Sequence, residues 1–213
     1  MITTGILSDS DPTGRPILEK AGRLGIPCFK PGYYRYAFAD VRKELESAAV
    51  SLRGLAELGA RFGVQLGFHN HAGYVGGPIW DIARVIDGLD PRWAGYYFDV
   101  RHAVVEGGDG GWRAAFSLVA PRLKMIAIKD FFWEKDQRGW QQRNCPLGEG
   151  MVNWKEFFAR LAGAGFHGPV SLHLEYEIPG STAAAKRENT LAAAARDLAF
   201  VKAGLAAAYA GHP

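Results

Sequence analysis

Histidine, acidic and lysine side chains gather at the ends of short apolar segments of this 213-residue chain. These positions are His69, His71, Asp99, His102, Lys129, His173 and Glu175. They include four of the six histidines, a clustering that a random distribution would rarely give. Imidazole and carboxylate groups that converge from separate segments form a ligand set for one divalent metal ion. A mixed nitrogen and oxygen set suits Zn²⁺, Mn²⁺, Co²⁺ or Fe²⁺, and Mg²⁺ less well.

The elements that must position these residues alternate between apolar strands and amphipathic helices. The sequence predicts strands over residues 2–8, 26–30, 64–71, 93–100, 123–132 and 169–176. Helices are expected over residues 14–25, 40–62, 79–88, 111–120 and 153–164, and again from Ser181 onward. Residues 133–152 are polar and rich in glycine, and they are expected to form a long loop.

Alternating strands and helices predict an α/β fold with a parallel sheet. Val64, Trp93 and Leu123 begin strands about 30 residues apart, as a strand–helix–strand unit requires. An open doubly wound sheet would carry a glycine-rich phosphate turn, and no G-x-G-x-x-G follows any of these strands. Polar residues at the carboxyl ends of several strands instead favour a TIM barrel. We therefore predict a single (β/α) barrel domain of about six βα units over residues 1–213.

Strand periodicity assigns these side chains to faces of the sheet. Residues two positions apart on a strand face the same way, so His69 shares a face with His71. Asp130 points away from the face of its neighbour Lys129, and a structural role is expected for it.

Five short motifs resemble those of a known family. In order along the chain they are FHNH at 68–71, FDVRH at 98–102, IKD at 128–130, PLGEG at 146–150 and SLHLEYE at 171–177. The chain resembles the xylose isomerase-like TIM barrels, a superfamily of sugar phosphate isomerases and epimerases that also includes inosose dehydratase and endonuclease IV. Members bind one divalent metal ion through Glu, Asp, His and Glu of the last four barrel strands.

The resemblance assigns roles to three residues of this sequence. Asp99 matches the Asp ligand, and Glu175 matches the last Glu ligand and the general base. His102 matches the histidine that follows the Asp ligand and contacts the substrate.

Two ligand positions depart from the family pattern. His69 stands where the family has its first Glu, and we take it as a metal ligand of changed type. Ala127 stands where the family has its His ligand, and His71 or His173 could fill the gap. The second carboxylate of an epimerase is therefore replaced by an imidazole.

The chemistry that the resemblance implies is proton abstraction next to a carbonyl, passing through an enediolate. We predict a metal-dependent isomerase or epimerase acting on a sugar, keto-sugar or polyol. The expected catalytic residues are Glu175, His102 and Lys129, and the expected metal ligands are His69, Asp99 and Glu175. The expected substrate-binding residues are His71, His173 and Arg101.

Three other functions stay open at this point. One is a metal-dependent dehydratase or lyase of the inosose or keto-sugar type, which needs a single base. Another is a degenerate, non-catalytic sugar-binding member, because a ligand has been lost. The weakest is a nuclease like endonuclease IV, which needs more His and carboxylate ligands than this chain offers.

Composition excludes several classes of protein. Lys and Arg number 25 and Asp and Glu 22, so the net charge is +3, and the dispersed charges argue against a nucleic-acid partner. No apolar stretch reaches about 18 residues, so no membrane span is expected. Residues 1–10 lack a signal peptide pattern, and two cysteines do not make a disulfide framework. We expect a cytoplasmic enzyme whose partner is a small sugar, with a homo-oligomer left open.

The chain is short for the fold it predicts. A TIM barrel typically needs about 250 residues. Counting back from Glu175 on the eighth strand makes residues 2–8 the third strand, so we expect the first two βα units to be missing from this sequence. Either the chain starts late in its gene, or the barrel is incomplete and something covers the gap.

Overall fold

The structure is a computed structural model that describes residues 1–211. The chain divides into two compact units, Met1–Ile126 and a second unit that starts at Ala127. The prediction of one domain over the whole chain stays a prediction. Among the described residues, every helix is too short or too polar to cross a membrane.

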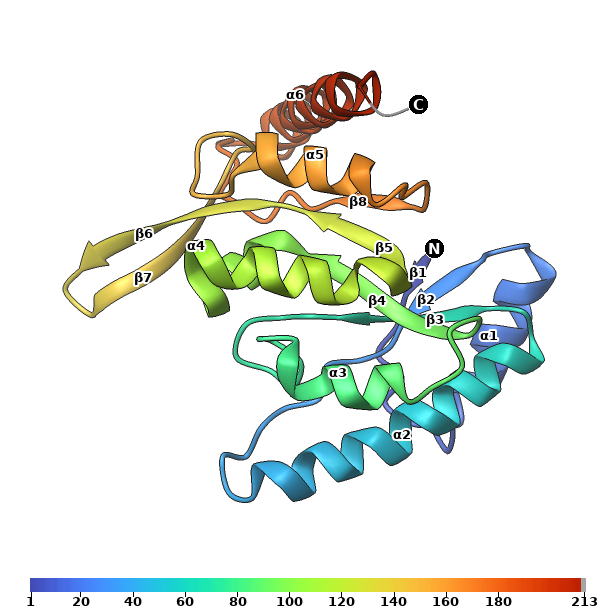
Figure 1. Cartoon of the computed structure of the whole chain (residues 1–213). Coiled ribbons are helices and arrows are strands. Elements are labelled where there is room, and N and C mark those ends of the chain that lie inside the picture. Colours follow the sequence, from blue (N-terminus) through green and yellow to red (C-terminus); the bar gives the residue numbers. More distant parts are fainter. Residues whose placement is uncertain (212–213) are drawn as a thin grey trace. The chain divides into compact units, whose positions relative to one another are not determined.

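The first unit alternates strands with helices in chain order (Figure 1). Its elements are β1 (Ile2–Thr3), α1 (Gly14–Arg23), β2 (Cys28–Lys30), α2 (Val41–Arg61), β3 (Gln65–His69), α3 (Trp80–Asp87), β4 (Ala94–Asp99), α4 (Val100–Val119) and a short 3₁₀ turn (Ala120–Arg122). Strand β5 (Leu123–Ile128) begins in this unit and ends in the second one.

The second unit adds a hairpin, two helices and one strand. Its elements are β6 (Asp130–Asp136), β7 (Gly139–Cys145), α5 (Trp154–Gly163), β8 (Val170–Leu172) and α6 (Ala183–Tyr209). The order of strands in the main sheet is β1-β2-β3-β4-β5-β8, with β5 common to both units. Strands β1 to β4 pair in parallel. This confirms the predicted α/β fold, an incomplete TIM barrel of six strands.

Aromatic side chains mark the face of the first unit's strands that the helices cover. The Phe29 ring lies so close to Gly59 of α2 that a Cβ there would be 3.0 Å away. Phe68 packs in the same way against Gly76 in the loop before α3, and Phe98 makes an edge contact with Phe116 of α4. Burial of these rings holds the helices on this face and leaves the alternate residues of each strand for the other face.

Helix α4 begins earlier than the sequence pattern indicates. The prediction placed a helix at 111–120, but α4 starts at Val100, directly after β4. The Asp99 carboxylate caps it by accepting a hydrogen bond from the His102 backbone N–H at 3.2 Å. The glycine-rich stretch around Gly108, which has a φ of 60°, kinks the helix. It also interrupts the spacing of apolar residues, so the sequence pattern predicts only the second half of the helix.

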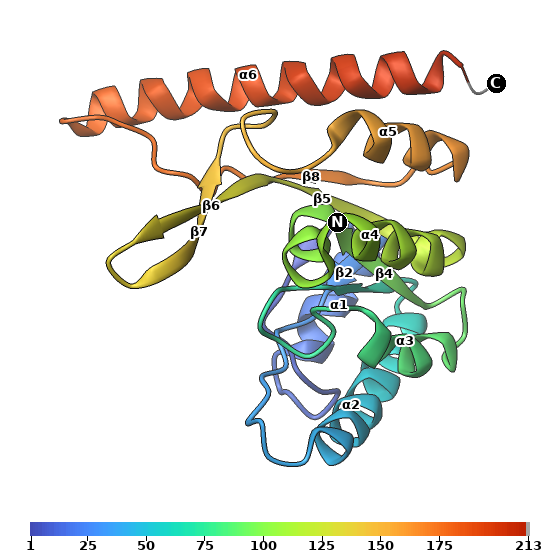
Figure 2. The ribbon, with the colours of Figure 1, turned by 60° about the vertical axis from the view of Figure 1, so that its left-hand side comes forward.

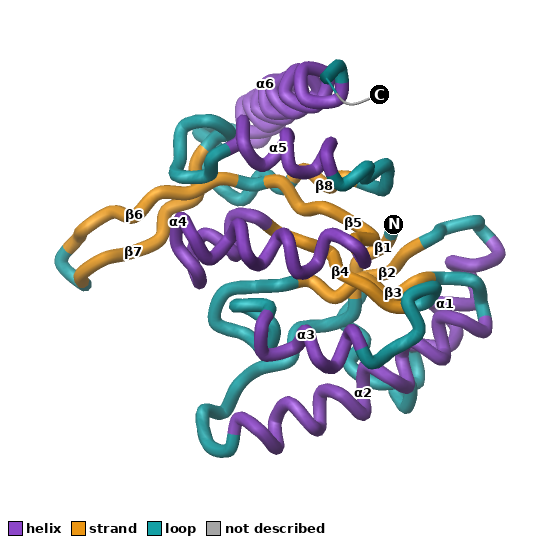
Figure 3. Tube along the Cα trace, viewed as in Figure 1, coloured by secondary structure: helices purple, strands orange, loops and turns teal. Residues whose placement is uncertain are grey.

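The predicted loop over residues 133–152 is wrong, because most of it forms the β6–β7 hairpin (Figure 3). Strand β5 also ends at Ile128 rather than at residue 132. The hairpin closes where Asp136 pairs with Gly139, whose φ of 95° suits glycine. The Arg143 guanidinium bonds Glu134 at 2.7 Å and Asp136 at 3.2 Å across the strands. Because such charged side chains are typical of loops, the sequence pattern predicted a loop here.

Helices α5 and α6 pack along each other, as two views of the ribbon show (Figures 1 and 2). Trp154 and Phe158 of α5 contact the Phe200 ring of α6. Gly204 allows this close approach, because a Cβ at that position would lie 2.3 Å from the Phe158 ring. The aromatic cluster forms the core of the second unit.

A buried carboxylate holds the P-L-G-E-G loop in place. Asp130 accepts hydrogen bonds from the backbone N–H groups of Gly148 (3.0 Å), Gly150 (3.2 Å) and Val152 (3.2 Å). It also accepts one from the Trp154 indole N–H at 2.7 Å. Gly150 has no room for a side chain, since a Cβ would lie 2.2 Å from the Asp130 carboxylate. Asp130 therefore has the structural role that was expected from its position.

Replacing Asp130 with alanine should destabilise the protein strongly. The change leaves five donors without their acceptor, because the Phe131 backbone N–H also donates to the carboxylate at 2.8 Å. Hydrogen bonds to a charged group contribute about 1.5–3 kcal/mol each, not additively. We expect urea unfolding to show a loss of about 3 kcal/mol or more. The matched control is Asp109→Ala, which removes an exposed ion pair with Arg113 and should cost about 0–1 kcal/mol. Equal effects of the two substitutions would contradict this account of the loop.

Candidate functional site

The strand register places three polar side chains of the first unit on one face. Phe29 of β2 pairs with Leu66 of β3, and His69 pairs with Tyr97 of β4. Phe29 belongs to the helix-covered face, so side-chain alternation puts Lys30, His69 and Asp99 on the opposite face. All three lie at the carboxyl ends of their strands, where TIM barrels carry their chemistry.

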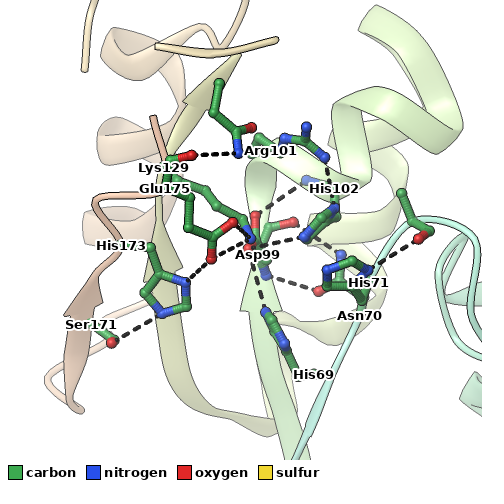
Figure 4. A network of polar contacts seen from close by, with 12 residues as sticks. His69, Asn70, His71, Asp99, Arg101, His102, Lys129, Ser171, His173 and Glu175 are labelled. Carbon is green, nitrogen blue, oxygen red and sulfur yellow. Dashed lines mark hydrogen bonds and ion pairs between the residues drawn. The ribbon is translucent and has the colours of Figure 1, made fainter. Parts of the chain in front are cut away.

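A buried cluster of two imidazoles surrounds the Asp99 carboxylate (Figure 4). Asp99 Oδ2 lies 3.3 Å from His69 Nε2 and 3.7 Å from His102 Nε2. The His71 ring packs against the His102 ring with centroids 3.9 Å apart. Donor atoms bound at about 2.1 Å to one tetrahedral ion are about 3.4 Å apart, which is close to the separation of His69 Nε2 and Asp99 Oδ2.

Asn70 fixes the position of Asp99. Its side-chain amide N–H donates to the Asp99 carbonyl at 2.9 Å, and its side-chain oxygen accepts from the Asp99 backbone N–H at 2.8 Å. The residue is fully buried. The sequence assigned no role to Asn70. Its place between His69 and His71 already indicated that its side chain lies on the face of the sheet opposite to theirs.

Tyr33 and Lys30 extend the cluster and were also missed from the sequence. The Tyr33 hydroxyl lies 3.0 Å from His69 Nδ1, and its ring contacts the His71 ring with centroids 4.8 Å apart. The Lys30 ammonium lies 3.4 Å from the centre of the Tyr33 ring. Burial lowers the pKa of Lys30 to about 8. Lys30 lies at the end of a predicted strand. Lys129 was selected from the sequence for the same kind of position, so the same criterion could have identified Lys30.

The second unit carries its own cluster around Glu175 (Figure 4). The Lys129 ammonium donates to both Glu175 oxygens, at 3.1 and 2.9 Å. His173 Nδ1 lies 3.2 Å from Glu175 Oε1, and its Nε2 lies 3.1 Å from Ser171 Oγ. The hydrogen bond with His173, together with the Lys129 charge, lowers the pKa of Glu175 to about 2 against the opposing effect of burial. The carboxylate is therefore firmly ionised near neutral pH.

The structure thus brings the expected residues together in two groups. His69, His71, Asp99 and His102 lie in the first unit, where Arg101 Nη1 is 3.0 Å from His102 Nδ1. The residues Lys129, His173 and Glu175 lie in the second. Within the part of the chain that the structure describes, no group of three or more His, Cys, Asp or Glu residues has the arrangement of a metal site. The assignment of His69, Asp99 and Glu175 to one ion stays a prediction.

The lost ligand position can be located in the structure. Ala127 is fully buried in β5, and its methyl side chain offers no donor atom. Both ring nitrogens of His173 already have partners, Nδ1 in Glu175 and Nε2 in Ser171. His71 Nδ1 lies 3.0 Å from the Ala72 carbonyl oxygen.

Comparison with protein families identifies a match over most of the chain. The model described as "Xylose isomerase-like TIM barrel" matches residues 15–203. A curated inosose dehydratase of Bacillus velezensis is 23% identical over 151 residues, which are 66% of this chain and 49% of that protein. The chain thus spans about half the length of this curated relative.

Solved structures share the fold at low sequence identity. A D-psicose 3-epimerase with D-tagatose from Clostridium cellulolyticum H10 has a TM-score of 0.71 at 15% identity, over 95% of this chain and 77% of its own. A xylose isomerase-like TIM barrel protein of Mycobacterium smegmatis, in complex with magnesium, has a TM-score of 0.63 at 16% identity. That match covers 90% of this chain and 66% of the other.

The ionised state of Glu175 should be visible in the pH dependence of stability. Its pKa falls from 4.5 to about 2 on folding, so its contribution is present above pH 4.5 and is lost as the pH falls towards about 2. We expect the gap in unfolding free energy between the wild type and Glu175→Gln to shrink over that range. Urea unfolding at a series of pH values measures it, and a constant gap would refute the ion pair with Lys129 and the contact with His173.

Proposed function

Because the chain belongs to the xylose isomerase-like TIM barrel family, we propose that it is a metal-dependent isomerase or epimerase acting on a sugar, keto-sugar or polyol. The observation that carries the proposal is the buried Asp99 carboxylate with imidazole nitrogens at 3.3 and 3.7 Å. This cluster lies at the carboxyl ends of β3 and β4, the edge at which TIM-barrel enzymes act.

We assign the metal ligands to His69, Asp99 and Glu175. The first two already have donor atoms at a spacing that one ion requires, and Glu175 offers an ionised carboxylate. When bound, a divalent ion supplies Lewis-acid stabilisation for the negative charge that develops on substrate oxygens. Tyr33 holds His69 Nδ1, which fixes the orientation of the ring that presents Nε2 to Asp99.

We assign to Glu175 the removal of the proton next to the substrate carbonyl. With a pKa of about 2 it is a weak base while it is held by His173 and Lys129. The proposal therefore requires Lys129 to transfer its hydrogen bonds from Glu175 to a substrate oxygen. That exchange raises the basicity of the carboxylate at the moment when the substrate is in place.

The remaining residues have supporting roles in the proposal. His102 and Lys129 deliver protons to substrate oxygens. His71, His173 and Arg101 bind the substrate hydroxyls. Arg101 is buried beside His102, with its Nη1 3.0 Å from His102 Nδ1.

Two alternatives have specific observations in their favour. The similarity to an inosose dehydratase favours a dehydratase, in which one base is sufficient and His102 or Lys129 assists the leaving hydroxyl. The alanine at position 127, where the family has its His ligand, favours a non-catalytic sugar-binding member. Metal analysis of the purified protein separates these: one equivalent supports either enzyme, and none supports the binding protein.

Glu175→Gln should preserve the fold but remove most of the activity. Glutamine has the same shape and keeps one carbonyl oxygen, but it cannot accept a proton. Loss of a general base typically lowers the rate by roughly 10²–10⁴. We would follow exchange of the hydrogen next to the carbonyl of a keto-sugar or inosose in D₂O by NMR. Exchange at the wild-type rate would exclude Glu175 as the base and leave His69 or Lys129.

Asp99→Asn should weaken metal binding before it affects the fold. Asparagine keeps the oxygen that caps α4 through the His102 N–H, but it removes the ligand charge. We expect the affinity for Mn²⁺, measured by calorimetry, to fall at least about tenfold, and excess metal to restore part of the activity. Asp109→Asn on exposed α4 surface is the control. Unchanged Mn²⁺ affinity in Asp99→Asn would remove Asp99 from the ligand set.

A further inference from the structure

Lys30 is a buried cation that has no acidic partner. The residue is 6% exposed, and the contact of its ammonium group is with the Tyr33 ring at 3.4 Å. Lys30 takes part in none of the ion pairs that the structure shows among residues 1–211, and burial is the cause of its lowered pKa. Lys129, the other strand-end lysine, differs because it has Glu175 as a counter-ion.

An ammonium group in this position is energetically unfavourable for the protein alone. Moving a charge out of water is costly unless an opposite charge or hydrogen-bond acceptors replace the water. A cation–π contact compensates only part of that cost. Burial accordingly lowers the pKa of Lys30 to about 8, so the group is still mostly protonated near neutral pH. A leucine or methionine would fill the same space at lower cost, which indicates that the charge serves a ligand.

The position of Lys30 shows where that ligand lies. The residue occupies the carboxyl end of β2, on the same face as His69 and Asp99. Tyr33 connects them directly, since its ring contacts the ammonium and its hydroxyl lies 3.0 Å from His69 Nδ1. One aromatic ring therefore separates the cation from the imidazole of the proposed metal ligand.

We propose that Lys30 binds an anionic substituent of the substrate, a carboxylate or a phosphate, while the reacting carbons lie at His69 and Asp99. The identity of this ligand as a substrate rests on the proposed function, whereas its charge rests on Lys30 itself. A neutral hydroxyl accepts a hydrogen bond but does not compensate a buried charge, so an acidic or phosphorylated sugar fits the site better than a neutral one.

The test is calorimetric binding near neutral pH, without added metal and without turnover. The probes are D-glucose, D-glucuronate and D-glucose 6-phosphate. They separate a neutral sugar from a carboxylate and from a phosphate. The variants are Lys30→Met and Lys30→Gln, which remove the charge with an apolar and a polar side chain. Lys43→Met, on the exposed surface of α2, is the matched control.

We expect the wild type to bind glucuronate or glucose 6-phosphate at least about tenfold more tightly than glucose, which corresponds to 1.4 kcal/mol. Both Lys30 variants should lose that preference, keep their affinity for glucose and unfold at the same or higher urea concentration than the wild type. Lys43→Met should bind all three probes as the wild type does.

Two results would overturn the proposal: variants that keep the preference for the anionic probe, or a wild type that has none. A marked loss of stability in both Lys30 variants would also contradict it, because it would show that the charge serves the fold. If Lys30-dependent binding is found but no sugar exchanges its hydrogen in D₂O, the proposed function fails while this inference stands.

Discussion

The paired hydrogen bonds between Asn70 and the Asp99 backbone are the contact on which the first unit's polar edge depends. They join the end of β3 to the end of β4 at a point where both strands have stopped pairing with each other. Asp99 can then cap α4 with one carboxylate oxygen and present the other to His69 and His102. A single buried carboxylate thus begins a helix and organises two imidazoles.

The two strand-end lysines illustrate how charge is distributed at these ends. Lys129 lies against Glu175, which keeps that carboxylate ionised and weakly basic. Lys30 lies against an aromatic ring and carries an uncompensated charge. In the proposed reaction the first lysine must exchange its partner for the substrate, while the second needs a ligand to complete its environment. Both requirements, a new partner for Lys129 and a ligand for Lys30, arise because a charge that is removed from water is unfavourable without a partner.

Much of the fold and part of the site could be predicted from the sequence, because strand alternation and helix capping are local properties. They correctly placed His69 and Asp99 at strand ends and gave Asp130 its structural role. Local reasoning failed where glycines interrupt a pattern, as in the first half of α4, and where charges mask strand periodicity, as in the β6–β7 hairpin. Tyr33 could not be assigned, because its contact with His69 joins residues far apart in the chain.

In the proposed site, His69, Asp99 and Glu175 together bind one metal ion. The most direct measurement is a crystal structure of the protein soaked with Mn²⁺, with the ion located by its anomalous scattering. We expect one ion per chain, with His69 Nε2 and oxygens of Asp99 and Glu175 at about 2.0–2.2 Å from it. An ion bound elsewhere, or none while Glu175 remains paired with Lys129, would contradict it.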